Sequence, residues 1–180
     1  GEHGLAILSR YPIGNVTLLR HTPLHSFWDE DEHYGGRATL AAEVVVAGQR
    51  VQIYASHLCT RDWTGSGRAK QGAEVRSHAA GADRPALQIW GGDFNTFLCN
   101  PQIMVCNQAP LAEPVITDTL ADGWTDLMPG FNSWTQLGVG VFPQRLDWIF
   151  GKGITPLSGK AMQSVQVADH VPVVAFAQLP

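Results

Sequence analysis

Short apolar runs, several of them rich in β-branched residues, alternate along the chain with glycine, proline and asparagine. Runs of this length bounded by turn residues are typical of β-strands. The pattern predicts strands at Leu5–Ser9, Val16–His21, Ala38–Val46, Arg50–Ser56, Ala86–Gly91, Leu146–Phe150 and Val171–Gln178. Ala47-Gly48-Gln49 separates two of these strands, so we expect a hairpin in which Gly48 takes a backbone conformation that other residues avoid.

Helical patterns are fewer. Ser66–Ala80 is dense in good helix formers and is followed by Gly81, which predicts a helix that ends there. A shorter helix is expected near Asn100, because Asn100-Pro101 offers an N-cap followed by a proline in the first turn. Pro110–Gln144 is rich in turn residues and aromatics, which predicts a long loop with short elements. The 180 residues are expected to form one domain, residues 1–180.

Charge and hydropathy narrow the classes of function. The chain has 12 Lys and Arg against 16 Asp and Glu, a net charge of −4. Domains that hold duplex DNA through many phosphates usually carry a basic excess, so this balance favours a small substrate. No apolar stretch is long enough for a transmembrane segment, and the first residues do not resemble a signal peptide. Because the chain lacks an initiator Met, we expect its native N-terminus and any targeting signal to be missing, which leaves localisation open.

The three cysteines, Cys59, Cys99 and Cys106, form no CxxC pair. Their spacing indicates neither a zinc site nor a disulfide framework. Reduced thiols are the default expectation. A bond between Cys99 and Cys106 across the loop that they bracket is the alternative if the protein is exported.

Polar residues at the ends of predicted strands are the first candidates for chemistry, because α/β proteins display reactive groups there. His57 extends the strand face that carries Val51 and Ile53. An imidazole at that edge can donate to a phosphoryl oxygen or protonate a leaving group. The alternative is a half-buried histidine with a structural partner.

A second candidate group follows Gly91 and Gly92, which allow the backbone to turn sharply. Asp93 and Asn95 stand two residues apart after these glycines and can point into one pocket. A carboxylate there can take a proton from water or bind a metal ion, and an amide can orient water or phosphate. The alternative is a capped turn, in which both residue types are common.

Two further acids interrupt or precede apolar strands. Asp147 lies inside an apolar strand, where a carboxylate is costly unless a partner satisfies it. Arg145 is the nearest candidate partner, and a histidine would serve equally well. Asp169-His170 directly precedes the last strand and offers that histidine, although an acid and a histidine in this place also suit a turn cap.

These motifs occur together and in order. The chain is similar here to the endonuclease/exonuclease/phosphatase superfamily, which includes DNase I, AP endonucleases, neutral sphingomyelinases and inositol polyphosphate 5-phosphatases. The segments that carry the resemblance are Gly4–Ile13, Ser56–Leu58, Gly92–Asn95, Arg145–Ile149 and Asp169-His170. The resemblance extends from Gly4 to about Ala177. It implies an α/β (α+β) fold, a DNase I-like four-layer α/β/β/α sandwich with two mostly antiparallel sheets.

The resemblance also implies an activity, the metal-dependent hydrolysis of a phosphodiester. Its substrate would be a small molecule, a lipid headgroup or a nucleic acid. The resemblance implies that Asp93 activates the attacking water and that Asn95 holds that water and the phosphate. It implies that His170 contacts a phosphate oxygen, with Asp147 hydrogen-bonded behind it, and that His57 assists at the phosphate or leaving group. Asp169 would bind Mg²⁺ or Mn²⁺ together with Asp93 and Asn95.

The chain also departs from the family pattern. Family members begin with a strand carrying an Asn, followed by a strand that ends in a metal-binding Glu, and nothing before Gly4 can supply them. We therefore expect the first strands to be missing, with weak metal binding and little activity. This leaves two alternatives to a phosphodiesterase of small molecules: a DNA or RNA nuclease, and a catalytically impaired phosphate-binding fragment. Trp124, Phe131 and Trp134 could stack bases or contact lipid, and simple packing is slightly favoured for them.

Overall fold

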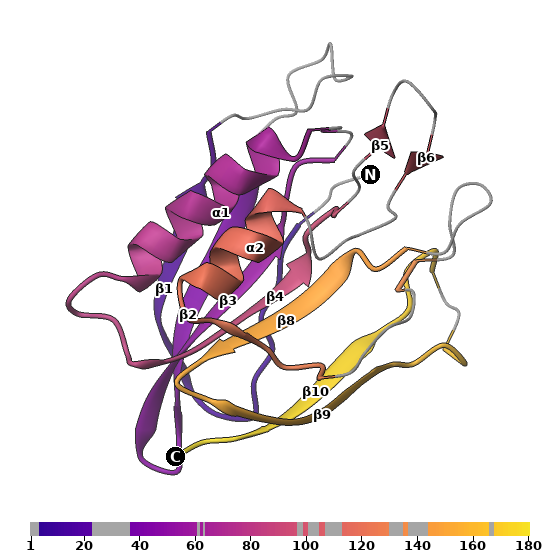
Figure 1. The fold of residues 1–180 in the computed structure, drawn as a ribbon. Helices are drawn as coiled ribbons and strands as arrows, with labels where there is room; N and C mark the ends of the chain where they lie inside the picture. Colours follow the sequence, from indigo (N-terminus) through magenta and orange to yellow (C-terminus); the bar gives the residue numbers. More distant parts are fainter. Residues whose placement is uncertain are drawn as a thin grey trace.

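The computed structural model of the chain describes residues 4–22, 37–60, 62, 64–96, 99–100, 105–106, 113–129, 135–136, 144–165 and 168–180. Its strands and helices are shown in Figure 1. They are β1 (Ile13–Arg20), β2 (Ala38–Val46), β3 (Gln49–His57), α1 (Ser66–Ala79), β4 (Leu87–Asp93), β5 (Cys99–Asn100), β6 (Val105–Cys106), α2 (Pro114–Ala121), β7 (Thr125–Asp126), β8 (Asp147–Lys152), β9 (Thr155–Ala161) and β10 (Val173–Gln178).

One mixed sheet organises the fold, with the strand order β1-β2-β3-β4-β8-β7. β3 and β4 are parallel, and the other neighbours are antiparallel. α1 forms the crossover that a parallel pair requires. The register pairs His57 with Asp93 and Asp93 with Asp147. Three of the predicted site residues therefore lie on adjacent strands at one edge of the sheet.

The predicted hairpin between β2 and β3 is confirmed. Val46 pairs with Gln49, so the connection is the two residues Ala47 and Gly48. Both have positive φ, 49° and 80°. Positive φ at both central residues is the type I′ turn, whose twist matches that of the flanking strands.

Each face of the sheet has its own hydrophobic cluster. Both helices pack on one face, where a group of large aromatic side chains is buried: Tyr54, Trp90, Phe94, Trp124, Trp148 and Phe150. α1 and α2 lie side by side there (Figure 1). On the other face, Val44, Val51 and Leu87 pack with residues of the β9–β10 pair such as Ala175. The described residues thus form a helical layer, the six-stranded sheet and the β9–β10 sheet, with β5 and β6 as a separate two-stranded sheet, which confirms the expected sandwich in part. They do not form its second helical layer.

A series of four hydrogen bonds, three of them buried, crosses the sheet beside the site edge. The Trp90 indole N–H donates to Ser56 Oγ (2.7 Å), Ser56 and Thr39 hydroxyls are 2.6 Å apart, and Thr39 Oγ1 lies 2.8 Å from His21 Nε2. His21 Nδ1 then lies 2.6 Å from Glu74 Oε2. All four bonds can run in one direction if His21 is neutral, and burial lowers the pKa of His21. This series of hydrogen bonds fixes the backbone next to His57, and each side chain in it has a partner.

Two sequence predictions are wrong. Leu5–Ser9 is not a strand, and Leu8 is 93% exposed, because no strand in the described part of the chain pairs with this segment. Asn100 does not begin a helix but pairs with Val105 between β5 and β6, so cross-strand bonding prevails over the local capping signal. The rest of that predicted helix lies outside the described residues.

Other elements were missed. α2 falls inside the predicted loop Pro110–Gln144, and its eight residues are too few for a clear periodic pattern. β9 contains Pro156 and Gly159, residue types that are depleted in strands. None of the helices in the described ranges is long and apolar enough to span a membrane.

Candidate active site

Four predicted site residues meet at one edge of the sheet. His57 ends β3, Asp93 ends β4 and Asp147 begins β8. His170 comes from the segment before β10, which a β-bridge to Gln136 holds in place. His57 Nε2 lies 3.4 Å and His170 Nε2 lies 3.8 Å from the same Asp93 oxygen, Oδ2. Residues far apart in sequence thus surround one carboxylate.

Asp93 is the carboxylate at the centre of this group, with 18% of its side chain exposed. Burial raises the pKa of Asp93 to about 6, and the negative charge of Asp147 adds to the rise. The Asn95 N–H bond and the positive charges of His170 and Arg37 oppose it. A carboxylate with this pKa is ionised at neutral pH yet more basic than an exposed aspartate, as a general base requires.

His170 is held by Asp147. Its Nδ1 lies 2.7 Å from Asp147 Oδ2, so the N–H donates to the carboxylate and Nε2 faces Asp93. This hydrogen bond, with the charges of Asp147 and Asp93, raises the pKa of His170 to about 9 against its partial burial. The imidazole is therefore a cation at neutral pH. Thr135 joins the two segments: its Oγ1 accepts from the Asp147 N–H (3.0 Å), and its carbonyl accepts from Val171 N–H (2.8 Å).

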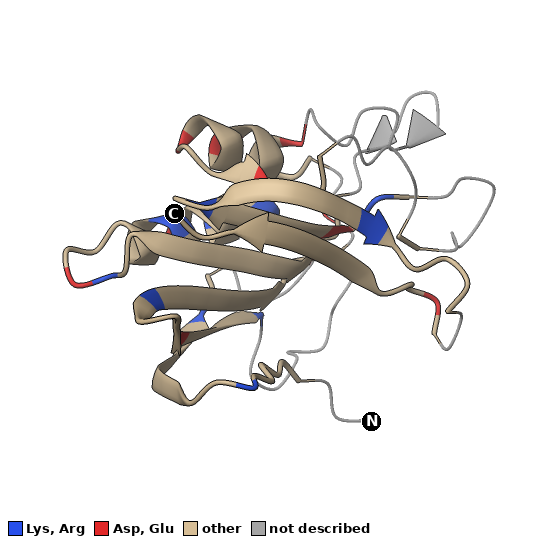
Figure 2. Ribbon diagram, turned by 90° about the horizontal axis from the view of Figure 1, so that it is seen from below, with Lys and Arg blue, Asp and Glu red and all other residues tan. Residues whose placement is uncertain are grey.

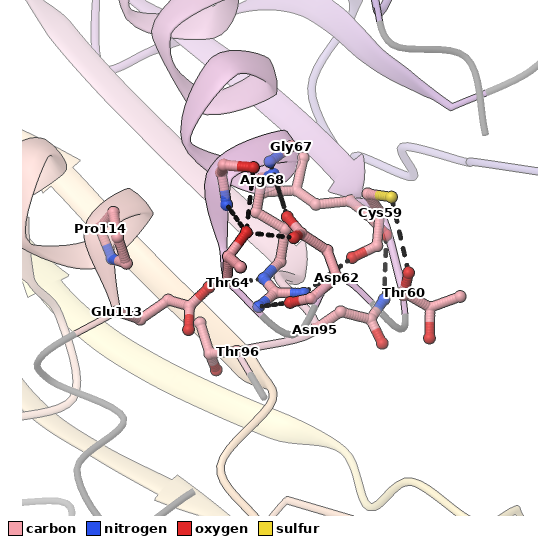
Figure 3. Close-up of polar contacts among 12 residues, drawn as sticks. Cys59, Thr60, Asp62, Thr64, Gly67, Arg68, Asn95, Thr96, Glu113 and Pro114 are labelled. Carbon is pink, nitrogen blue, oxygen red and sulfur yellow. Dashed lines mark hydrogen bonds and ion pairs between the residues drawn. The ribbon is translucent and has the colours of Figure 1, made fainter. Parts of the chain in front are cut away.

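Asn95 has an unusual backbone, with φ of 48°. Its N–H donates to Asp93 Oδ1 (2.8 Å), a local turn that Asn tolerates better than most residues. Its side-chain Nδ2 donates to the Leu58 carbonyl at 3.0 Å. With the amide nitrogen so engaged, Oδ1 is the atom turned away from that segment, as Figure 3 shows. This hydrogen bond sets which end of the Asn95 amide is the donor and which is the acceptor.

Gly92 makes this approach possible. Its φ is 140°, and a Cβ there would lie 2.0 Å from the Ser56 carbonyl oxygen. Only glycine fits between β3 and β4 at this point. The glycine just before Asp93 therefore reflects close strand packing as well as the sharp turn that the sequence predicts.

Arg145 is not the partner of Asp147. Its guanidinium pairs with Asp126 at 2.7 Å and lies 3.5 Å over the Trp148 ring. The alternative partner, His170, takes the Asp147 carboxylate instead. Trp124 is 3% exposed and packs in the aromatic cluster, which confirms simple packing for this residue. Phe131 and Trp134 lie outside the described residues.

The metal ligands that the resemblance implies, Asp93, Asn95 and Asp169, stay a prediction. Among the residues that the structure describes, no three His, Cys, Asp or Glu side chains could hold a metal ion together. Asp169 is exposed, while Asp93 and Asn95 lie on the sheet edge. These three residues alone thus do not form a closed cage for a hard cation, which prefers six or more oxygen ligands.

Sequence reasoning missed two residues at this edge. Arg37 directly precedes β2 and is close enough for its charge to stabilise the Asp93 carboxylate. Thr135 joins the segments of Asp147 and His170. Neither stands in a motif, and only the strand register and the bridge at Gln136 reveal them.

An edge where an Asp–His pair and a second histidine surround a buried carboxylate is an arrangement suited to phosphate-ester hydrolysis. The sequence profile of the Endonuclease/Exonuclease/phosphatase family matches residues 1–170. The chain therefore belongs to this family, whose members are phosphate-ester hydrolases. No curated protein matches the chain in sequence.

Solved structures share the fold. The human Nocturnin catalytic domain with bound sulfate has a TM-score of 0.63 at 17% identity, over 95% of this chain and 60% of that one. TDP2 from D. rerio in complex with a single-strand DNA product has a TM-score of 0.63 at 18% identity, over 92% of this chain and 68% of that one. The inositol polyphosphate 5-phosphatase domain of synaptojanin, with inositol (1,4)-bisphosphate and calcium, has a TM-score of 0.61 at 16% identity, over 93% of this chain and 55% of that one. The chain thus spans about 60% of the Nocturnin domain that it matches.

Proposed function

We propose that this chain carries the acid and base residues of a metal-dependent phosphoesterase that hydrolyses a phosphodiester by in-line attack of water. The observation that supports the proposal best is the cluster around Asp93, with His57 at 3.4 Å and the Asp147-bound His170 at 3.8 Å. Phosphodiester hydrolysis needs a base that takes a proton from water and, close to it, a cation that stabilises the charge on the phosphate.

Each residue has a role that its environment supports. Asp93, ionised at neutral pH, would take a proton from the attacking water, and Asn95 Oδ1 would accept a second hydrogen bond from that water. His170, protonated at neutral pH, would donate from Nε2 to a phosphate oxygen, with Asp147 holding the ring. His57, 41% exposed, would contact the phosphate or the leaving oxygen.

The proposed metal ion is Mg²⁺ or Mn²⁺. Asp93, Asn95 and Asp169 would be its ligands in this chain, and such an ion would add positive charge at the phosphate. Because the described residues do not form a complete site, we derive no step from the ion and expect weak binding. Isothermal titration with Mn²⁺ measures this affinity directly.

The substrate that we favour is a small-molecule or lipid-headgroup phosphodiester. The net charge is −4, and Figure 2 shows Lys and Arg scattered along the described ribbon. A nuclease is the runner-up, since one similar structure is a complex with a DNA product. The incomplete metal site favours a second candidate function, a catalytically impaired chain that only binds phosphate.

Hydrolysis of bis-p-nitrophenyl phosphate with millimolar Mg²⁺ or Mn²⁺ tests the activity. We expect slow turnover that Asp93→Asn abolishes and that the surface variant Asp122→Asn retains. Equal turnover in Asp93→Asn and the unchanged chain would rule out the proposed base. Parallel assays with abasic DNA, plasmid DNA and sphingomyelin separate the substrate classes. If nothing is hydrolysed but phosphate shifts the imidazole NMR signals of His57 and His170, the phosphate-binding alternative holds.

A further inference from the structure

The backbone just after β3 leaves the sheet beside the active site and needs partners for its polar groups. α1 supplies them from a single turn. The Cys59 N–H donates to Gln71 Oε1 (2.8 Å), and Arg68 Nη1 and Nη2 donate to the carbonyls of Cys59 (3.3 Å) and Asp62 (2.7 Å). Figure 3 shows the contacts from Cys59 and Asp62 converging on the Arg68 guanidinium.

Asp62 also binds the helix in return. Its Oδ2 accepts from the N–H groups of Gly67 (2.6 Å) and Arg68 (3.1 Å), at the open N-terminus of α1. The loop and the first turn of the helix are thus joined in both directions. The junction holds the backbone at Cys59 and Asp62 against the first turn of α1.

The Arg68 side chain is fully buried, and so is that of its partner Glu113, with Nε and Oε1 2.6 Å apart. Taking two charges out of water costs free energy, and a buried ion pair is often no more stabilising than apolar residues of the same size. A guanidinium nevertheless offers what an apolar side chain does not, a rigid fork that holds two carbonyls and a carboxylate at once. This points to a geometric role for the pair.

The geometry that this fork fixes is that of Asn95. The segment held by Arg68 and Gln71 includes Leu58, whose carbonyl accepts from Asn95 Nδ2 and whose N–H donates to the Asp93 carbonyl at 2.9 Å. A shift of the Leu58 carbonyl would release the amide and let it turn over, so that a donor would replace the acceptor Oδ1 at the site.

We propose that Arg68 and Gln71 are positioning residues of the active site, which hold the backbone after His57 and thereby set the orientation of the Asn95 amide. The effect of Arg68 and Gln71 on turnover rests on the proposed function of Asn95. The structural part, that the helix sets the amide, stands without any activity. Each part therefore has its own measurement.

The structural part is tested by NMR on the ¹⁵N-labelled chain. The Asn95 side-chain amide signals are assigned by their loss in Asn95→Ala. We expect Arg68→Lys, which keeps a positive charge near Glu113, to speed hydrogen exchange of that amide about 10-fold or more. Gln71→Met, which removes one acceptor and no charge, should act in the same direction if Arg68→Lys does not fold. Arg76→Lys is the matched control, because Arg76 lies about two turns further along α1 and pairs with Asp122 at the end of α2, away from the loop. Exchange as slow in both test variants as in Arg76→Lys would overturn the proposal.

The functional part is tested by a double-mutant cycle on phosphodiester turnover. We expect Arg68→Lys to lower kcat about 10- to 100-fold with little change in KM, because misplaced groups cost rate more than binding. In that background, Asn95→Ala should cost at least about fivefold less than in the unchanged chain. Equal losses in the two backgrounds would contradict an action through Asn95. If no form of the chain turns over, the proposed function fails, and the exchange result still decides whether Arg68 and Gln71 set the amide.

Discussion

The Asp147–His170 pair gives a prediction whose size follows from the structure. Replacing Asp147 with Asn removes the charge behind the imidazole but keeps an oxygen that can accept from Nδ1. The pKa of His170, about 9 in the native chain, should then fall toward the ordinary value of 6.5. The main cause of the rise is the Asp147 hydrogen bond, assisted by the charge of Asp147, and the variant weakens the first and removes the second.

The same shift has a consequence for stability. A difference of roughly 2.5 pH units corresponds to about 3 kcal/mol, as an upper value for a side chain that is partly exposed. The folded pKa is raised above the unfolded one, so this contribution is fully present below about pH 6.5 and is lost as pH rises through about 9. The native chain should therefore lose free energy of unfolding over that window by about 1–3 kcal/mol more than Asp147→Asn does.

Imidazole proton NMR of His170, measured in the presence of a chelator, gives the pKa directly, and urea denaturation at pH 6 and pH 9.5 gives the stability. Asp122→Asn, a change of the same kind at an exposed acid that pairs with Arg76 far from His170, is the control. It should leave the His170 pKa and the change in stability between pH 6 and pH 9.5 unchanged. A His170 pKa within about half a unit of native in Asp147→Asn would refute the reasoning, because Asp147 would then not be the main cause of the shift.

Three further predictions concern the fold. Arg68→Met should lower the free energy of unfolding by about 3–5 kcal/mol in urea denaturation, because it leaves Glu113 buried without a partner; adding Glu113→Leu should recover most of the loss, and no recovery would contradict the ion-pair argument. Gly92→Ala should cost about 2–4 kcal/mol by thermal or urea unfolding, and near-native stability would show that the strands can separate there. The backbones of Cys99 and Cys106 pair directly. After treatment with oxidised glutathione, peptide mapping should therefore find a disulfide between them. Finding free thiols at both positions, and no disulfide, would refute this prediction.

Much of the fold could be predicted from the sequence, because strands that pair on both sides reveal themselves by alternation and by bounded apolar runs. β2 and the turn at Gly48 are examples. The prediction fails where local and non-local preferences disagree. Leu5–Ser9 has the composition of a strand but pairs with no strand in the described part of the chain. Asn100 is a good helix N-cap by residue type, yet it pairs with Val105 of the next strand.

The candidate site follows the same rule. Asp93, His170 and Asp147 could be picked out because a carboxylate or an imidazole beside an apolar strand needs a partner. Which residue satisfies Asp147 could not be decided, since Arg145 and His170 were equally suitable until the fold placed Asp126 against the arginine. Arg37 left no trace in any motif, because its relation to Asp93 exists only through the pairing of β2, β3 and β4.

The central claim is that Asp93 is the base of a phosphoesterase. The measurement that tests it most directly is the rate of phosphodiester hydrolysis by the chain and by Asp93→Asn, with millimolar Mn²⁺ and with folding of both checked by circular dichroism. The account predicts a slow rate that depends on the metal and falls by at least about 100-fold in the variant. A folded Asp93→Asn variant that hydrolyses the substrate as fast as the unchanged chain would contradict it.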